Sequence, residues 1–210
     1  MSLWTRFISA PLVKCACSTG AIRYYRKQII PHAFGRVLEV GCGDGQNFKY
    51  YDPDKLSSLI ALEPEPVMMR SARKKQSDLG SIPVEFIEGG AESLPLDDKS
   101  VDCVIITFVL CTIPDWNVAL REVKRVLKPN GKILFGEHGL SPEPNVQTWQ
   151  RRIEPVWKLF AGGCHLTRKP EDMLTSSGFK TTILKHSYMR MSPKPVSYVS
   201  QGEAVIEIQT

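Results

Sequence analysis

Residues 37–45 constrain the fold of this chain more than any other stretch. They begin as a short, mostly apolar run that carries one carboxylate, Glu39, and they end in a turn with glycine at positions 41, 43 and 45. Such a run is typical of a buried parallel strand. Glycines directly after it let the backbone turn sharply and approach a ligand closely. Because ligands of open α/β sheets bind at the carboxyl ends of the strands, we predict that residues 37–45 form the first strand and the cofactor turn of a nucleotide-type domain.

Further apolar runs alternate with helical patterns along the chain. After the first strand, strands are predicted at residues 59–62, 84–87, 101–108, 132–137, 179–186 and 196–208. This alternation indicates βαβ units and a mainly parallel sheet. We therefore predict one α/β domain with a Rossmann-like, seven-stranded, mostly parallel sheet, helices on both faces and an antiparallel last strand.

The chain divides into four parts around this pattern. Residues 1–35 are predicted to form an N-terminal helical cap, with Tyr24 or Tyr25 reaching into the cofactor pocket, and residues 36–140 form the cofactor-binding core. Residues 141–170 carry Trp149, Trp157 and Phe160 at helical spacing. They are predicted to form an inserted helical lid that roofs an apolar acceptor pocket. Residues 171–210 supply a helix and the closing strands.

Composition excludes several classes of protein. The chain is 42% hydrophobic and 23% charged, which is ordinary for a globular protein. Its net charge of +5 is too dispersed for a nucleic-acid-binding tail. None of the six cysteines forms a C-x-x-C pair, so no metal site is predicted. No apolar run reaches the roughly 18–20 residues that span a bilayer, so we expect a cytoplasmic protein. A peripheral membrane contact through residues 3–8 remains an open expectation.

The glycine turn alone is compatible with more than one ligand. A phosphate-binding P-loop requires lysine after its last glycine, but Gln46 follows Gly45. The third glycine falls one place too early for the usual dinucleotide motif, and Asp44 would repel a pyrophosphate. Glu63, at the end of the second strand, is suited to binding the hydroxyls of a ribose. These residues indicate an adenosine-type ligand and leave an NAD-type Rossmann oxidoreductase as an alternative.

Several motifs then follow one another in order: Glu39, Gly41-Cys42-Gly43-Asp44-Gly45, Glu63, Ala91-Glu92-Ser93-Leu94-Pro95, Val101-Asp102 and residues 120–131. Together they resemble the class I S-adenosylmethionine-dependent methyltransferases, type 11-like, over about residues 35–140. Phe108-Val109-Leu110-Cys111 and residues 154–158 and 162–168 are similar to a narrower group, the methyltransferase-like alkyl thiol S-methyltransferases.

The resemblance implies S-adenosylmethionine as cofactor, S-adenosylhomocysteine as product, and a set of binding residues. Glu39 would support the turn and face the cofactor's ammonium, and Glu63 would hold the ribose. Many relatives have Asp where this chain has Gly90, so Glu92 is expected to supply the bond to the adenine. The implied cofactor-binding residues are Glu39, Gly41, Cys42, Gly43, Gly45, Glu63, Pro64, Gly90, Ala91, Glu92, Thr107, Phe108 and Val109.

Methyl transfer requires mainly that the acceptor be aligned and water excluded. A general base is needed only if the acceptor arrives protonated, and a thiol is partly ionised at neutral pH. His138 and His165 are the candidate catalytic residues, with Glu137 and Asp115 as further candidate bases. A small, rather apolar acceptor is expected: a thiol, phenol, quinone precursor or lipid-like molecule. A protein that binds the cofactor without turnover is the remaining alternative.

Overall fold

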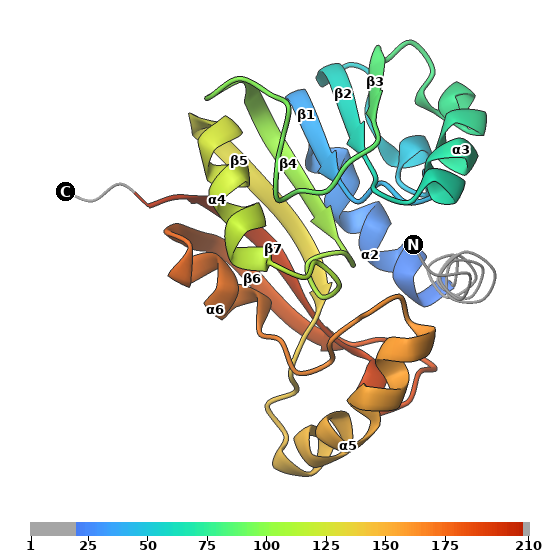
Figure 1. Cartoon of the computed structure of the whole chain (residues 1–210), viewed down its shortest axis with the longest axis vertical. Coiled ribbons are helices and arrows are strands. Elements are labelled where there is room, and N and C mark those ends of the chain that lie inside the picture. Colours follow the sequence, from blue (N-terminus) through green and yellow to red (C-terminus); the bar gives the residue numbers. More distant parts are fainter. Residues whose placement is uncertain (1–19, 208–210) are drawn as a thin grey trace.

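The computed structural model describes residues 20–207, which form one seven-stranded sheet flanked by helices (Figure 1). The order of strands across the sheet is β3-β2-β1-β4-β5-β7-β6. β1 to β5 are parallel, and β7 runs antiparallel to both β5 and β6. The strands are β1 (Gly35–Val40), β2 (Leu56–Leu62), β3 (Val84–Ile87), β4 (Val101–Thr107), β5 (Leu127–His138), β6 (Phe179–Tyr188) and β7 (Tyr198–Ile206). The predicted fold class is confirmed, including the antiparallel last strand.

Helices cover both faces of the sheet, as predicted. They are α2 (Gly20–Ile29), α3 (Pro66–Lys74), α4 (Trp116–Val126), α5 (Pro144–Phe160) and α6 (Pro170–Ser176). Alternate residues of β1 point to opposite faces, so Leu38 packs in one core with α4 and α6. Val37 packs in the other core with α2 and α3. Each face of the central strands is therefore buried, which explains why their sequences are continuously apolar.

The sequence pattern predicts a helix that begins over residues 46–51, a single helix over residues 64–80 and a turn at residues 129–131, and the structure corrects all three. The helix expected from Gln46 is only a turn followed by a 3-10 helix, Phe48–Tyr50, because Asn47 turns its side chain into the core and Asp52-Pro53 follows at once. The single helix expected over residues 64–80 is α3 followed by a 3-10 helix, Gln76–Leu79. The turn expected at residues 129–131 lies within β5, where the pairing with β4 shifts register.

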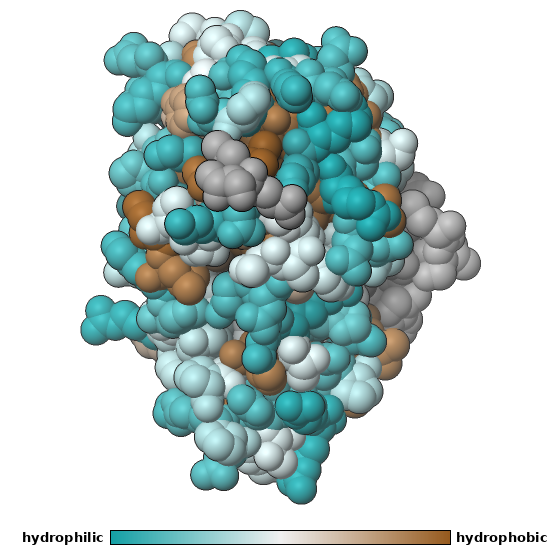
Figure 2. Space-filling view, turned by 90° about the vertical axis from the view of Figure 1, so that its left-hand side faces the viewer, coloured by the Kyte–Doolittle hydropathy of each residue, from teal (hydrophilic) through white to brown (hydrophobic). Residues whose placement is uncertain are grey.

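The end of the molecule around α5 lies beyond the carboxyl ends of the parallel strands (Figure 1). The side turned toward the viewer in Figure 2 is mostly hydrophilic, with hydrophobic residues in small separate groups. Among the described residues no helix is both long and apolar enough to cross a membrane. Residues 3–8, for which a membrane contact was predicted, lie outside the described part of the chain.

Candidate active site

A cavity of about 500 Å³ lies at the carboxyl ends of β1 to β4. Its lining comes from the glycine turn, the segments after β2, β3 and β4, helix α2 and the chain directly after α5. Eleven of the predicted cofactor residues line it: Gly41, Cys42, Gly43, Glu63, Pro64, Gly90, Ala91, Glu92, Thr107, Phe108 and Val109. Gly45 lies in the same turn but is not itself in the lining. The sequence therefore located the cavity correctly, although binding by these residues stays a prediction.

The glycine turn has the backbone geometry that its sequence predicts. Gly41, Gly43 and Gly45 all have positive φ, at 65°, 58° and 76°, which L-residues with a Cβ rarely adopt. A Cβ at position 41 would overlap Cγ2 of Val109 in the loop after β4. A Cβ at position 43 would meet only Met68, at 3.7 Å. Gly41 is therefore needed for both its conformation and its space, and Gly43 for its conformation.

Glu39 lies beneath this turn, and its side chain is 1% exposed. Its carboxylate accepts hydrogen bonds from Nδ2 of Asn47 at 2.8 Å and from the Tyr51 hydroxyl at 2.8 Å. Burial raises the pKa of Glu39 to about 7, although these two hydrogen bonds act to lower it. Glu39 does not line the cavity, so the structure places it as a support of the turn. Its predicted contact with the cofactor's ammonium stays a prediction.

Arg26 of α2 is a lining residue that the sequence analysis missed. It donates from Nη1 to Oδ1 of Asn47 at 2.6 Å, and Asn47 in turn donates to Thr107 Oγ1 at 3.0 Å. Within the described residues, the buried Nε of Arg26 has no hydrogen-bond partner. The two tyrosines expected in this position lie elsewhere: Tyr24 is 60% exposed, and Tyr25 is buried against Ser187. The cap therefore presents a cation to the cavity in place of an aromatic ring.

The second strand ends at Glu63, which closes one side of the cavity. Its two carboxylate oxygens accept from the backbone N–H groups of Gly43 at 2.9 Å and Glu65 at 3.0 Å. Burial raises the pKa of Glu63, against these two hydrogen bonds. Asp44, which the sequence analysis treated as repelling a pyrophosphate, forms a 2.9 Å ion pair with Lys75. Its charge is therefore offset, and the exclusion of a pyrophosphate depends less on Asp44 than we expected.

The segment after β3 brings the side chain of Glu92 next to Gly90. A Cβ at Gly90 would come within 2.6 Å of Oε2 of Glu92. The Glu92 carboxylate thus occupies the space that a side chain at position 90 would take. Both residues line the cavity. The predicted bond from Glu92 to the adenine stays a prediction.

The loop after β4 forms the other side of the cavity and is held by a second buried glutamate. Glu137, at the end of β5, accepts hydrogen bonds from the backbone N–H groups of Val109, Leu110 and Cys111 at 2.7, 3.0 and 3.2 Å. Burial raises the pKa of Glu137 to about 7, although these N–H groups lower it. Phe108 begins the loop with φ +55°, a strained value for a bulky residue. Glu137 thus organises the loop, and its oxygens are committed to that role.

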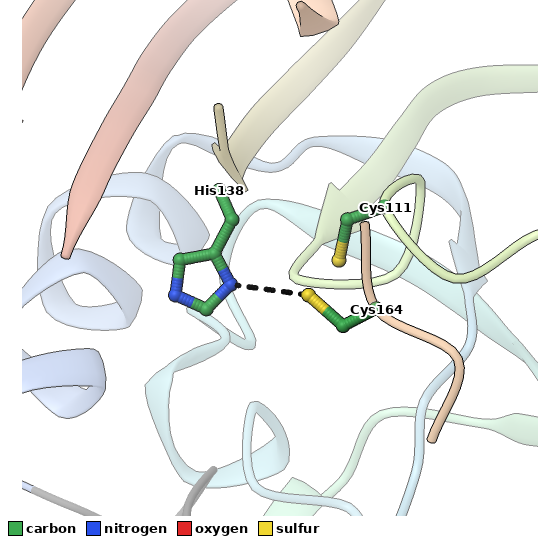
Figure 3. Close-up of side chains that lie close together, drawn as sticks. All are labelled: Cys111, His138 and Cys164. Carbon is green, nitrogen blue, oxygen red and sulfur yellow. Dashed lines mark hydrogen bonds between the residues drawn. The ribbon is translucent and has the colours of Figure 1, made fainter. Parts of the chain in front are cut away.

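Three residues distant in sequence meet behind this loop (Figure 3). Cys111, His138 and Cys164 bring one ligand-type atom each to within 4.8 Å of the others, and Sγ of Cys164 lies 3.7 Å from Nδ1 of His138. The hydrogen bond with Cys111, followed by that with His138, holds the pKa of the Cys164 thiol well below its usual range. The prediction of no metal site considered only spacing in the sequence, and the fold brings together a set of residues that spacing could not show.

The candidate bases differ in their surroundings. The ring of His138 packs edge-on against that of Phe108, which lines the cavity, with centroids 5.2 Å apart. His165 is not part of the lining, and its Nδ1 lies 3.2 Å from Oε1 of Glu154. Asp115 accepts from the N–H of Val118 and caps the N-terminus of α4. None of these three candidates lines the cavity itself, and His138 is connected to the lining through its ring contact with Phe108.

The aromatic residues predicted to roof the cavity do not line it. Trp149 and Phe160 of α5 are 55% and 44% exposed, and neither lines the cavity. Trp157 instead packs against the buried thiols Cys111 and Cys164. The part of the inserted segment that reaches the lining is the pair after the helix, Ala161 and Gly162. The helical period was correct, but Trp157 packs inward against the thiols and not over the cavity, while Trp149 and Phe160 are exposed.

The sheet order and the cavity at its carboxyl edge define a class I methyltransferase fold. A sequence model described as a methyltransferase domain matches residues 38–135. The YcgJ protein of Bacillus subtilis has a solved structure that superposes with a TM-score of 0.67 at 17% identity, covering 90% of this chain and 99% of that one. This likeness supports the fold.

Sequence relatives then identify the family. Thiol S-methyltransferase TMT1B of Rattus norvegicus is 34% identical over 172 residues, which cover 80% of this chain and 70% of the relative. Human thiol S-methyltransferase TMT1A is 35% identical, with the same two coverages. The C-methyltransferase UbiE of Rickettsia prowazekii, of ubiquinone and menaquinone biosynthesis, is 35% identical over 56% of this chain and 51% of its own length. The chain belongs to the methyltransferase family and is an S-adenosylmethionine-dependent methyltransferase, not the NAD-type oxidoreductase left open by its glycine turn.

Proposed function

We propose that this enzyme transfers a methyl group from S-adenosylmethionine to the sulfur of a small, apolar thiol. The observation that carries the proposal is the division of the cavity into two chemically different parts. One part presents Glu63, Glu92 and the glycine turn, and the other presents Phe108, Val109, Ile113, Pro114 and Ala161. A polar part suits an adenosyl group, whereas an apolar part suits an uncharged, hydrophobic acceptor.

The chain's own residues fit the cofactor. Glu63 has a carboxylate at the end of β2 where ribose hydroxyls are bound in this fold, and Glu92 borders the adenine side. The buried Nε of Arg26, which lacks a partner among the described residues, offers a donor for the carboxylate of the methionine part. When bound, the cofactor supplies an already activated methyl group, so the protein has mainly to align the acceptor and exclude water.

A thiol is favoured over the other small acceptors for two reasons. The thiol S-methyltransferase relatives match 80% of the chain, whereas the quinone-pathway relative matches 56%. A thiol also needs the least help from a base, because it is partly ionised near neutral pH. The positions of two candidate bases agree with this: Glu137 is committed to three backbone N–H groups, and His165 lies outside the cavity lining.

The test combines binding with turnover. Calorimetry with S-adenosylhomocysteine should show binding that weakens about 10- to 100-fold in Glu63→Ala, because charge-assisted hydrogen bonds are lost. Glu88→Ala, at an exposed position after β3, is the control and should bind as the unmodified chain does. Labelled cofactor offered with alkyl thiols, phenols and quinols should label the thiols preferentially. Preferential labelling of phenols or quinols would refute the thiol, and binding without any transfer would favour a non-catalytic cofactor-binding protein.

A further inference from the structure

The geometry points to a site for Zn²⁺ formed by Cys111, His138 and Cys164, with a fourth coordination position available to the sulfur of the acceptor thiol. Two thiolates and one imidazole are a ligand set that zinc prefers, and three protein ligands are typical of zinc sites that keep one position open. The proposed metal site does not depend on the proposed function. The role of the fourth position depends on the proposed thiol acceptor.

The distances agree with a tetrahedral metal. Bonds of about 2.3 Å to sulfur and 2.0 Å to nitrogen at tetrahedral angles place a sulfur and a nitrogen ligand about 3.6 Å apart. Sγ of Cys164 and Nδ1 of His138 are 3.7 Å apart. All three ligand-type atoms lie within 4.8 Å of one another, and Figure 3 shows them pointing toward a common space. Only small shifts of side chains are therefore needed to bind the ion.

The ligands come from three separate segments that the fold holds in place. The N–H of Cys111 donates to Glu137, and Arg168 donates to the carbonyls of Leu110 and Ile113 on either side of it. The N–H of His165 donates to the carbonyl of Cys111 at 2.9 Å, which ties the segment carrying Cys164 to the loop after β4. These hydrogen bonds hold the backbone that carries Cys111 and Cys164 in place.

The surroundings suit a neutral complex. Cys111 and Cys164 are 3% and 5% exposed, and they pack with Leu166, Ile153 and Trp157. Before the acceptor binds, two thiolates offset the charge of one Zn²⁺, so the resting complex carries no net charge into this apolar environment. The two thiols are not joined in a disulfide. A divalent ion therefore explains why two cysteines and a histidine converge in an otherwise hydrophobic cluster.

The site lies next to the apolar part of the cavity. Phe108 contacts His138, Thr112 follows Cys111, and Gly162 lies two residues before Cys164; all three of these neighbours line the cavity. An acceptor thiol that enters from the cavity loses its S–H proton to solvent as its sulfur binds the metal. Methyl transfer then forms the S–CH₃ bond and breaks the methyl–sulfonium bond, whose electron pair stays on the cofactor's sulfur. The thioether product is a weaker ligand and leaves.

Metal content is the first test, with the full chain purified under reducing conditions. Elemental analysis should find about one zinc ion per chain, and much less in Cys111→Ser and Cys164→Ser. Cys103→Ala is the matched control, because Cys103 is equally buried but lies in β4 away from the cluster, and it should retain the zinc. A metal-free wild-type chain that also binds no added zinc would overturn the site, as would a Cys111–Cys164 disulfide that persists in reductant.

Cobalt provides a second test that needs no variant to fold. Wild-type protein loaded with Co²⁺ should show thiolate-to-cobalt charge-transfer absorption and the strong visible bands of a tetrahedral site. Propanethiol should shift these bands, while propanol should not. Absent charge-transfer bands overturn the site, and unchanged bands with propanethiol overturn the assignment of the fourth position.

A third measurement separates this inference from the proposed function. Removing the metal with a chelator should lower transfer to propanethiol at least about tenfold and leave S-adenosylhomocysteine binding unchanged. A zinc-containing chain that does not bind S-adenosylhomocysteine would refute the proposed function and leave the metal site intact. Equal thiol methylation with and without metal would refute the role of the metal in catalysis.

Discussion

Two loops border the same cavity, and each lies over a buried glutamate whose pKa is raised to about 7. The glycine turn after β1 lies over Glu39, which bonds two side chains, Asn47 and Tyr51. The loop after β4 is held by Glu137, which bonds three backbone N–H groups. Glycine geometry therefore shapes the first loop, whereas a carboxylate from a neighbouring strand shapes the second. The two glutamates look alike in burial and pKa but should differ in what their loss does.

The largest expected difference comes from replacing each glutamate by alanine. Glu137→Ala leaves three N–H groups without their acceptor and should lower the free energy of unfolding by roughly 3–5 kcal/mol. Glu39→Ala leaves Asn47 still bonded to Thr107 and mainly isolates the Tyr51 hydroxyl, so roughly 1–3 kcal/mol is expected. Urea denaturation followed by circular dichroism measures both. Glu85→Ala, exposed on β3, is the control and should change stability by less than about 0.5 kcal/mol. Equal losses at positions 39 and 137 would remove the distinction.

The contact between the two loops gives the next largest effect. Gly41→Ala adds a methyl group against Val109 at a positive φ and should cost about 3 kcal/mol, from overlap and backbone strain together. Gly43→Ala has the same strain without the overlap and should cost about 1 kcal/mol. The double variant with Val109→Ala should recover part of the loss at Gly41 and none at Gly43. A double-mutant cycle that shows no such coupling would mean that the two loops are independent.

The pH dependence of stability tests whether the pKa values of the two glutamates are raised in the folded chain. A carboxyl whose pKa is about 7 in the folded chain and near 4.5 when unfolded keeps its proton in the folded state between these values. Raising the pH through this window therefore favours unfolding, by up to about 1.4 kcal/mol per pH unit for each group. Glu39→Gln should remove one such contribution, so the difference in unfolding free energy between variant and wild type should grow in the variant's favour from pH 5 to 7. A constant difference across this range would show that the pKa of Glu39 is not raised.

The comparison also explains what the sequence could predict. The strands, the glycine turn and Glu63 were predictable because each is encoded in a short run: buried strands are apolar throughout, and a turn with positive φ needs glycine. Glu39 was found for the same reason, since it belongs to the run itself. Residues that act through tertiary contacts left no such signal. The role of Glu137 depends on N–H groups at least 26 positions earlier in the chain, and that of Arg26 depends on Asn47, 21 positions later.

The sequence also could not show which way individual side chains point or which distant segments meet. The period of α5 predicted an amphipathic helix, yet period alone did not show that Trp157 would turn inward and Trp149 outward. Spacing also argued against a metal site, because Cys111 and Cys164 are 53 positions apart and meet only when the segment after α5 folds against the loop after β4. Local pattern thus located the cofactor side of the cavity, whereas the acceptor side depends on contacts between distant segments.

The smallest predicted effect tests whether Tyr51 stabilises the glycine turn through its hydrogen bond to Glu39. Tyr51→Phe removes the hydroxyl that bonds Glu39 and that acts to lower its pKa. The pKa of Glu39 should rise further, so the variant should lose about 1 kcal/mol relative to wild type above pH 7 and less at pH 5, where Glu39 is protonated in both proteins. Tyr50→Phe, at the neighbouring, less buried tyrosine, is the control and should show no such pH dependence. A loss that is the same at both pH values would mean that Tyr51 stabilises the turn by packing and not through the carboxylate.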